Sequence, residues 1–271
     1  MLFDSHTHMN NDGLTDHQRK RIAEEIEASA VSYVADIGFD LESSATAAKH
    51  AEKYPWCYAA VGFHPHNAKE MDETDLQMIK ALAKKPKVKA IGEAGLDFYR
   101  DLSPRDAQRE CFRKQIRLAN ELKMPIVVHS RDADQEVLDI LREEQAFSNE
   151  RISWFPQIQG KPDARVLLHC FSGNKEIARQ LVKLGATISI AGPITYKNAR
   201  KSVEVVEEIP IEHLLIETDA PYLTPEPFRG KRNKTPYVEY VAKKIAEIKG
   251  MTYEEVAKIT CENAKRFYGI E

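Results

Sequence analysis

Eight short apolar segments are spread along the whole chain, and they constrain its fold more than any other feature. They have the composition of buried parallel strands, and they cover residues 2–5, 32–37, 58–63, 88–92, 126–128, 166–168, 186–190 and 213–216. Longer amphipathic stretches separate them, which is the pattern of repeated βα units. The sequence therefore predicts a TIM-like (β/α)8 barrel that forms a single domain over residues 1–271. A doubly wound open sheet is the alternative, because a strand count from one sequence can be wrong by one or two.

Local signals mark the starts of several predicted helices. The stretches 15–18 and 252–255 match the capping-box pattern, in which a threonine and a residue three positions later satisfy each other's backbone N–H groups. Serine followed by proline at 103–104 predicts an N-cap and a proline in the first helical turn. The amphipathic run 253–267 predicts an additional helix after the last βα unit.

The charge of the chain is nearly balanced, with 39 basic and 42 acidic residues and a formal net charge of −3. This balance gives no overall attraction for nucleic acid or acidic membranes, although a local basic rim could still bind phosphate. No apolar run is long enough to span a membrane, and a signal peptide would have to end before residue 6. We therefore expect a soluble cytoplasmic protein whose four scattered cysteines are reduced thiols.

A polar stretch over residues 144–164 interrupts the regular alternation. It follows a predicted helix and precedes a predicted strand, which places it at the N-terminal face of the barrel, opposite the catalytic face. Its apolar residues, among them Trp154 and Phe155, are expected to pack beneath the barrel. A self-association surface is the alternative, and we expect either a monomer or a weak homo-oligomer.

Ionisable side chains stand at the carboxyl ends of five predicted strands. They are His6, His8, Glu93, His129, His169 and Asp219. His6 and His8 are two positions apart, so in an extended strand both imidazoles point to the same side. Any one of the six could instead cap a helix or a backbone carbonyl, but ionisable groups are rarely buried together unless they are paired or bind a metal. The set therefore predicts a metal site at the C-terminal ends of the strands, where barrel enzymes build their active sites.

The ligand types indicate which metals the site can take. Four histidines and two carboxylates without a thiolate suit Zn²⁺, Mn²⁺, Fe²⁺, Co²⁺ or Ni²⁺. Six ligands are more than one catalytic zinc uses, because an open position must remain. A two-metal site with a shared ligand fits better, and two nearby cations can activate a water molecule and stabilise charge on the attacked centre.

Seven segments, in order over nearly the whole chain, carry a family resemblance. They are DSHTH at 4–8, GFHPH at 62–66, IGEAGLDFY at 91–99, PIVVHSRDA at 125–133, LLHCFSG at 167–173, ETDAPYLTP at 217–225 and FRGKRNKTP at 228–236. In these segments the chain resembles the TatD family of metal-dependent deoxyribonucleases, within the amidohydrolase-like metal-dependent hydrolases. The resemblance implies two divalent cations per chain, drawn from Zn, Mn, Mg, Ni and Fe. The chain departs from the family in its longer 144–164 connection.

The resemblance also assigns roles to individual residues. One cation is expected at His6, His8, Glu93 and Asp219, and the second at Glu93, His129 and His169. Glu93 would bridge the two cations, at the position where many amidohydrolase relatives carry a carboxylated lysine. Asp219 is expected to be the general base, since a carboxylate beside the activated water can accept its proton.

Other polar residues near the predicted strand ends have more than one interpretation. His64 is expected to contact either a substrate phosphate or a carboxylate of the site, whereas His66 is expected to be a surface-loop residue. Glu217 faces the same interior as Asp219, where it could orient a ligand or form a buried pair within the barrel. The stretch 97–99 is expected to shape the pocket, and one of its aromatic residues could stack on a base.

Two arginines are candidates for binding the substrate. Arg131 and Arg229 are predicted to clamp phosphate groups, because a guanidinium matches phosphate oxygens with two parallel donors. Together with Lys231 and Arg232 they would form the local basic rim that the overall charge lacks, although the cluster 229–234 could also be a solvated loop.

These observations predict a metal-dependent hydrolase of DNA that trims single-stranded or frayed 3′ ends, as a 3′–5′ exonuclease does. The first alternative keeps the same binuclear site but hydrolyses an ester, amide or lactone in a small metabolite or an aminoacyl-tRNA, because fold does not fix the substrate. The second alternative is a metal-loaded binding protein without activity, which the presence of a base at Asp219 disfavours.

Overall fold

The computed structural model describes residues 1–11 and 13–271, in which eight strands alternate with helices. The strands are β1 (Leu2–Thr7), β2 (Val31–Ile37), β3 (Cys57–Val61), β4 (Val88–Asp97), β5 (Ile126–Arg131), β6 (Val166–Leu168), β7 (Ala186–Ile190) and β8 (Leu214–Ile216). The helices are α1 (Asp16–Glu27), α2 (Leu41–Lys53), α3 (Glu73–Ala83), α4 (Arg105–Glu121), α5 (Asp134–Glu143), α6 (Asn149–Ser153), α7 (Lys175–Lys183), α8 (Arg200–Glu208), α9 (Val238–Lys249) and α10 (Tyr253–Tyr268). Among these helices, none is both long enough and apolar enough to cross a lipid bilayer.

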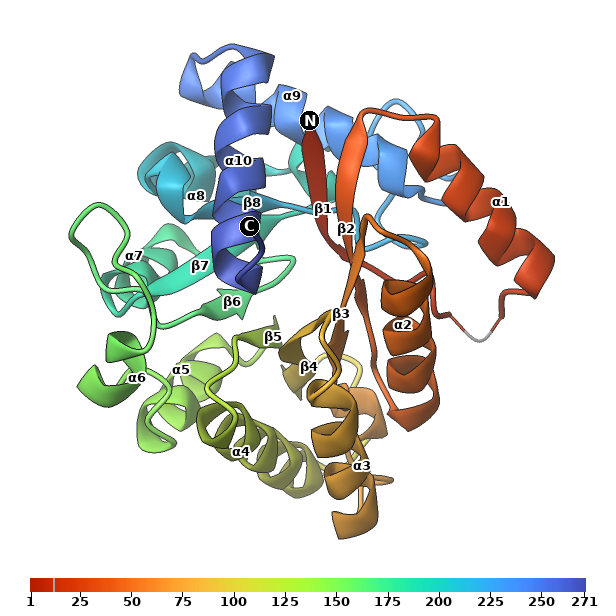
Figure 1. Cartoon of the computed structure of the whole chain (residues 1–271). Helices are drawn as coiled ribbons and strands as arrows, with labels where there is room; N and C mark the ends of the chain where they lie inside the picture. Colours follow the sequence, from red (N-terminus) through yellow and green to blue (C-terminus); the bar gives the residue numbers. More distant parts are fainter. Residues whose placement is uncertain (12) are drawn as a thin grey trace.

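The strands form one parallel sheet in the order β1 to β8, and the sheet curls until its first and last strands meet. Beyond β8, the backbone N–H of Asp219 donates to the carbonyl of His6 at 2.9 Å, and that of His8 donates to Ala220 at 2.8 Å. The helices surround the strands on the outside (Figure 1). The predicted (β/α)8 barrel is confirmed, and the open-sheet alternative is wrong.

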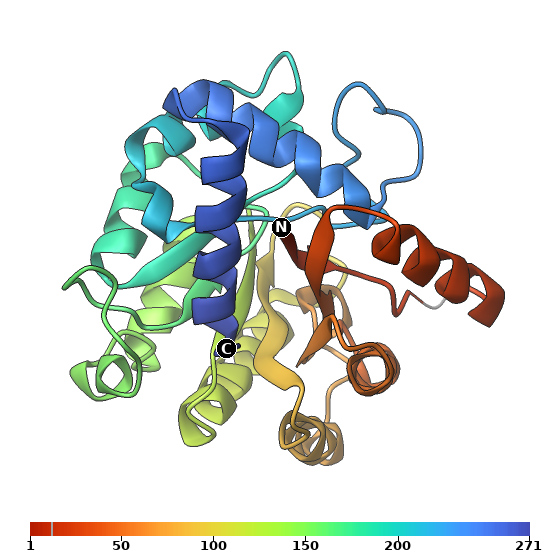
Figure 2. The ribbon, with the colours of Figure 1, turned by 45° about the horizontal axis from the view of Figure 1, so that its top comes forward.

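The interior of the barrel is filled by apolar side chains, and α10 closes one end of it. Phe3, Ala35, Ala60, Val127 and their neighbours form the buried cluster inside the strands. Phe267 and Tyr268 at the end of α10 belong to the same cluster, and the Tyr268 hydroxyl donates to the carbonyl of Ser5 at 2.8 Å. This helix lies at the end of the barrel where the chain begins (Figures 1 and 2), so the opposite end carries the loops that follow the strands.

The predicted helix starts are confirmed at two of the three positions. Capping boxes form at Thr15 before α1 and at Thr252 before α10. The predicted N-cap at Ser103 is wrong, because α4 begins after Pro104 without a side-chain cap. The Ser103 hydroxyl instead donates to the carbonyl of His66 at 2.7 Å, and it thereby ties the loop after β3 to the loop before α4.

The 144–164 stretch packs onto the barrel around one buried arginine. Arg151, in α6, is completely buried, and its guanidinium donates to the carbonyl oxygens of Met124 and Ala164 at 2.9 and 2.8 Å. Two half-buried aromatic rings from the same stretch flank this guanidinium. Arg151 therefore gives hydrogen-bond partners to carbonyl oxygens before the stretch and at its end. Its use as a self-association surface stays a prediction.

Candidate metal centre

The two histidines of β1 meet at the open end of the barrel. A register shift lies between Asp4 and Thr7, where β1 advances one residue more than β2. Such irregularities re-aim side chains at strand ends. The Nε2 atoms of His6 and His8 lie 3.3 Å apart. Nδ1 of His8 donates to the carbonyl of Ile37 at 2.8 Å, and this hydrogen bond directs Nε2 of the ring toward the centre.

A second register shift, in β4, positions Glu93. The strand continues to Asp97 instead of ending at Gly92 as predicted, and the shift falls between Ile91 and Ala94. Gly92 and Gly95, on either side of Glu93, have φ values of +135° and +147°. A Cβ on Gly95 would lie 2.0 Å from the carbonyl oxygen of His129. Only glycine fits there. The Gly-Glu-Ala-Gly sequence was therefore a usable signal for an irregular strand around Glu93.

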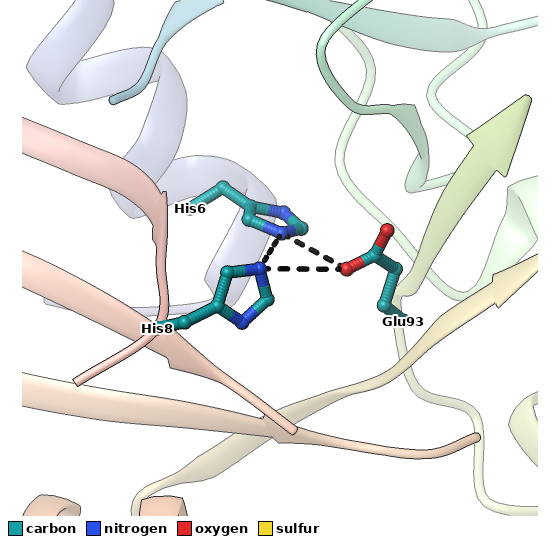
Figure 3. Close-up of side chains that lie close together, drawn as sticks. All are labelled: His6, His8 and Glu93. Carbon is teal, nitrogen blue, oxygen red and sulfur yellow. Dashed lines mark hydrogen bonds and ion pairs between the residues drawn. The ribbon is translucent and has the colours of Figure 1, made fainter. Parts of the chain in front are cut away.

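The two carboxylate oxygens of Glu93 face two different groups of histidines. Oε2 lies 3.2 Å from Nε2 of His6 and 3.7 Å from Nε2 of His8 (Figure 3). Oε1 lies 2.9 Å from Nδ1 of His129 and 2.8 Å from Nε2 of His169. Burial opposes ionisation of Glu93, but the surrounding histidines, His169 foremost, hold its pKa well below the usual range. Glu93 is therefore an anion placed between two sets of nitrogen donors.

Asp219 completes the group around His6 and His8. Its Oδ1 lies 3.3 Å from Nε2 of His8 and 3.8 Å from Nε2 of His6. Burial would raise the pKa of Asp219, but the hydrogen bond and charge of His8 outweigh it, so the pKa lies below its usual value. Asp4, which sequence reasoning did not single out, fixes this loop because its Oδ1 accepts from the backbone N–H of Thr218 at 2.9 Å.

Two further carboxylates stand behind the histidines that face Oε1 of Glu93. Nε2 of His129 lies 3.2 Å from Oδ2 of Asp97, and Nδ1 of His169 lies 3.3 Å from Oε1 of Glu217. Both acids are buried, and Glu217 also accepts a short hydrogen bond from the Ser189 hydroxyl. Carboxylates in this position orient a ligating imidazole and raise its basicity. Of the two interpretations of Glu217, the geometry matches the one that orients a ligand.

Asp97 also changes the interpretation of His66. The expected surface-loop position of His66 is wrong, because its side chain is only 29% exposed and its Nε2 lies 2.8 Å from Oδ2 of Asp97. Burial would raise the pKa of Asp97, but the hydrogen bond from His129, with those from Arg100 and His66, lowers it. The sequence placed Asp97 near the pocket but gave no sign of this role, because the contact joins β4, β5 and the loop after β3.

His64 lies inside the site and against Glu93. Its Nδ1 accepts from the backbone N–H of His66 at 3.1 Å, so the proton of the neutral ring is on Nε2. That Nε2 lies 3.3 Å from Oε1 of Glu93. Burial lowers the pKa of His64 to about 4, which keeps the ring neutral at pH 7. His64 therefore lies against Glu93, itself a candidate metal ligand, and its contact with a substrate phosphate stays a prediction.

Arg131 and Arg229 are not brought into contact with the six candidate ligands among the described residues. Both are exposed, Arg131 as the last residue of β5 and Arg229 on the chain that follows β8. The guanidinium carbon of Arg131 lies 4.2 Å from the ring centroid of Tyr99, and that of Arg229 lies 4.2 Å from the ring centroid of Tyr196. Each guanidinium thus packs against an aromatic ring, and cation–π attraction holds it there.

The spacing of the donor atoms fits divalent cations. Ligands that are about 2.0–2.2 Å from one cation lie roughly 3–3.5 Å from each other. Within the first group, the distances from His6 Nε2 to His8 Nε2 and to Glu93 Oε2 are 3.3 and 3.2 Å. Within the second, Nδ1 of His129 and Nε2 of His169 lie 3.2 Å apart. The side chains can therefore hold metal, as nitrogen and oxygen donors without sulfur.

Comparison with known proteins places the chain in a family. The family described as TatD related DNase matches residues 3–269, a range that includes all six candidate ligands. The "Uncharacterized metal-dependent hydrolase YabD" of Bacillus subtilis (strain 168) is 47% identical over 270 residues, which cover 100% of each chain. The "3'-5' ssDNA/RNA exonuclease TatD" of Citrobacter rodentium (strain ICC168) is 35% identical over 248 residues, covering 90% of this chain and 89% of the relative. The crystal structure of YJJV, a TatD homologue from Escherichia coli K12, superposes with a TM-score of 0.86 at 25% identity, covering 100% and 98% of the two chains.

Proposed function

The chain belongs to the family of TatD-related DNases and is a metal-dependent hydrolase, and from that premise we propose that it hydrolyses phosphodiester bonds in DNA. The proposed substrate is a single-stranded or frayed 3′ end, from which nucleotides are removed one at a time. A relative that is 35% identical over nine-tenths of this chain bears the name of a 3′–5′ exonuclease of single-stranded DNA and RNA, which supports this substrate class.

The proposal rests on Glu93, because its two carboxylate oxygens face two different groups of donor atoms. The proposed cations number two per chain, with one at His6, His8, Glu93 and Asp219 and the other at Glu93, His129 and His169. When bound, the cations would supply Lewis-acid stabilisation of the phosphate charge and make the attacking water more acidic. Zn, Mn, Mg, Ni and Fe all fit a nitrogen and oxygen ligand set to different degrees.

The side chains of the site have two further roles, which are to accept a proton and to orient the ligating histidines. Asp219 is ionised, so it can accept the proton that water loses as its oxygen bonds to phosphorus. The bond from phosphorus to the 3′ oxygen of the remaining strand then breaks, and that oxygen takes up a proton from solvent. Asp97 and Glu217 hold the rings of His129 and His169 in place. These buried contacts fix the ligand atoms before the substrate arrives, which is what positioning requires.

The rim of the site supports a nucleic-acid substrate. Arg131 and Arg229 are proposed to bind phosphates on either side of the scissile bond, because each guanidinium is exposed and held against an aromatic ring. Tyr99 is 60% exposed although it is a large aromatic residue, so its free face is available for stacking on a base.

A nuclease assay on purified protein tests the proposal. A 5′-labelled single-stranded oligonucleotide should shorten progressively in the presence of each candidate metal and stay intact with a chelator. Carboxylic esters, amides and lactones at equal metal concentration provide the comparison, because the same centre could attack a carbonyl carbon. The nuclease function would be contradicted if the wild type shortened the oligonucleotide no more than an Asp219→Asn variant does. Turnover of a carbonyl substrate by the same preparation would then favour the hydrolase of an ester, amide or lactone.

A further inference from the structure

A cavity of about 250 Å³ lies beside the metal centre, between α1 and the chain that follows β8. Its walls are largely aliphatic. The apolar lining is contributed by Met9, Leu14, Ile22, Pro221 and Pro236. None of these residues has a role in the site described above, so the cavity is a separate feature that the proposed chemistry leaves unused.

The cavity and the metal centre share one wall. His8 lines the cavity, and its Nε2 lies 3.3 Å from Asp219 in the centre. Ala220, the residue after Asp219, also lines it. A group seated in the cavity therefore stands next to whatever is bound at the His6–His8 half of the centre. Tyr222 extends this wall outward, because its ring centroid lies 6.3 Å from that of His8 and the residue is 55% exposed.

The rest of the lining is polar, and it includes three cationic side chains, Arg21, Arg232 and Lys234, with one carboxylate, Glu25 on α1. Oε1 of Glu25 lies 3.6 Å from Nε of Arg21 and 2.9 Å from Nζ of Lys234, so the lining keeps an excess of positive charge. The ion pair between Glu25 and Lys234 joins the two sides of the cavity. Asn233, which is buried, holds the same segment by donating to the carbonyl of Thr218 at 2.8 Å. These two contacts hold the segment after β8 against α1 and against the strand end.

We propose that this cavity receives the nucleobase of the nucleotide next to the scissile phosphate, an inference that rests on the proposed nuclease function. A base has apolar faces that aliphatic walls can cover, and it is attached to a phosphate that needs cations nearby. An acyl group of an ester would use the apolar walls but not the three cations. Because His8 belongs both to the cavity wall and to the centre, a base in the cavity would lie next to a phosphate held at the centre.

A cycle that combines an enzyme variant with a substrate variant tests the inference. Ile22→Trp fills the cavity from α1, and oligonucleotides that carry an abasic sugar at the last or the next-to-last position remove one base at a time. In the wild-type enzyme, loss of the base that occupies the cavity should raise KM about tenfold, by the usual contribution of one base contact. Ile22→Trp should raise KM to the same degree for the complete oligonucleotide, and the two losses should not multiply.

The controls separate the possible failures. Met78→Trp, on the exposed surface of α3, adds the same side chain elsewhere and should leave KM unchanged. Ile22→Phe fills less of the cavity and serves if the tryptophan variant unfolds. If the effects of Ile22→Trp and base removal multiply at both positions, the cavity does not hold a base and the inference is overturned while the nuclease function stands. A wild-type enzyme that cleaves no oligonucleotide overturns the proposed function and this inference together.

Discussion

The two halves of the candidate metal centre are held in different ways. In the half built on β5 and β6, each histidine has a buried carboxylate behind it, Asp97 for His129 and Glu217 for His169. In the half built on β1 and the end of β8, Nδ1 of His8 donates to a backbone carbonyl. Nδ1 of His6 has no hydrogen-bond partner among the described residues.

The difference predicts unequal metal affinity. A carboxylate behind an imidazole raises its basicity and fixes its orientation, and the loss of such a partner costs about 10–100-fold in affinity. The half that contains His129 and His169 should therefore bind its cation more tightly. The half that contains His6 and His8 also holds Asp219, the proposed general base, and it adjoins the cavity.

The largest effect should come from Glu93, the residue that both halves share. Glu93→Gln keeps the shape of the side chain but removes the negative charge that faces the four candidate ligand histidines. We expect both cations to be lost or weakened and activity to fall by more than about 100-fold. Elemental analysis of the purified variant, with thermal unfolding to establish that it is folded, measures this. Retention of one full equivalent of metal would mean that the halves do not depend on a shared ligand.

A smaller and one-sided effect is expected at Asp219. Asp219→Asn removes the proton acceptor, so kcat should fall by about 10²–10⁴-fold. The cation at His129 and His169 should stay, because neither residue contacts Asp219. Metal content and single-turnover rate measured on the same preparation check both parts. Loss of the metal from both halves would contradict the comparison.

Asp97 tests the tighter half directly. Asp97→Asn removes the charge behind His129 and should weaken the tighter cation by about 10–100-fold without changing the weaker one. Asp101→Asn is the matched control, because Asp101 lies nearby on the surface and pairs with Arg105 rather than with a histidine. Equal metal affinity in both variants would show that Asp97 does not tune the site.

The smallest effect should be at the rim, which belongs to neither half. Arg131→Ala removes a proposed phosphate contact, so KM for an oligonucleotide should rise several-fold with little change in kcat. The salt dependence of binding should fall by about one unit in the log–log slope. Arg142→Ala, on α5, is the control for loss of a positive charge elsewhere. An unchanged slope for Arg131→Ala would remove this residue from the substrate path.

Much of this architecture could be predicted, because the informative patterns are local. Apolar runs located the eight strands, and the polar residues at their ends were the ones that the barrel brings together. The continuation of β4 to Asp97 could not be predicted, because a register shift depends on the partner strand and not on local alternation. The role of Asp97 and the partner of Ser103 could not be predicted either, since each contact joins segments that are separate in the sequence. The cavity needs the closed barrel, because its walls come from segments about 200 residues apart.

A calorimetric titration of Mn²⁺ into metal-free protein tests the central claim most directly. For the wild type we predict two binding steps of different affinity. His6→Ala should lose the weaker step and keep the tighter one, whereas His129→Ala should lose the tighter one. If either substitution removes both steps together, or if His6→Ala removes the tighter step, the two halves are not the unequal cation sites described above.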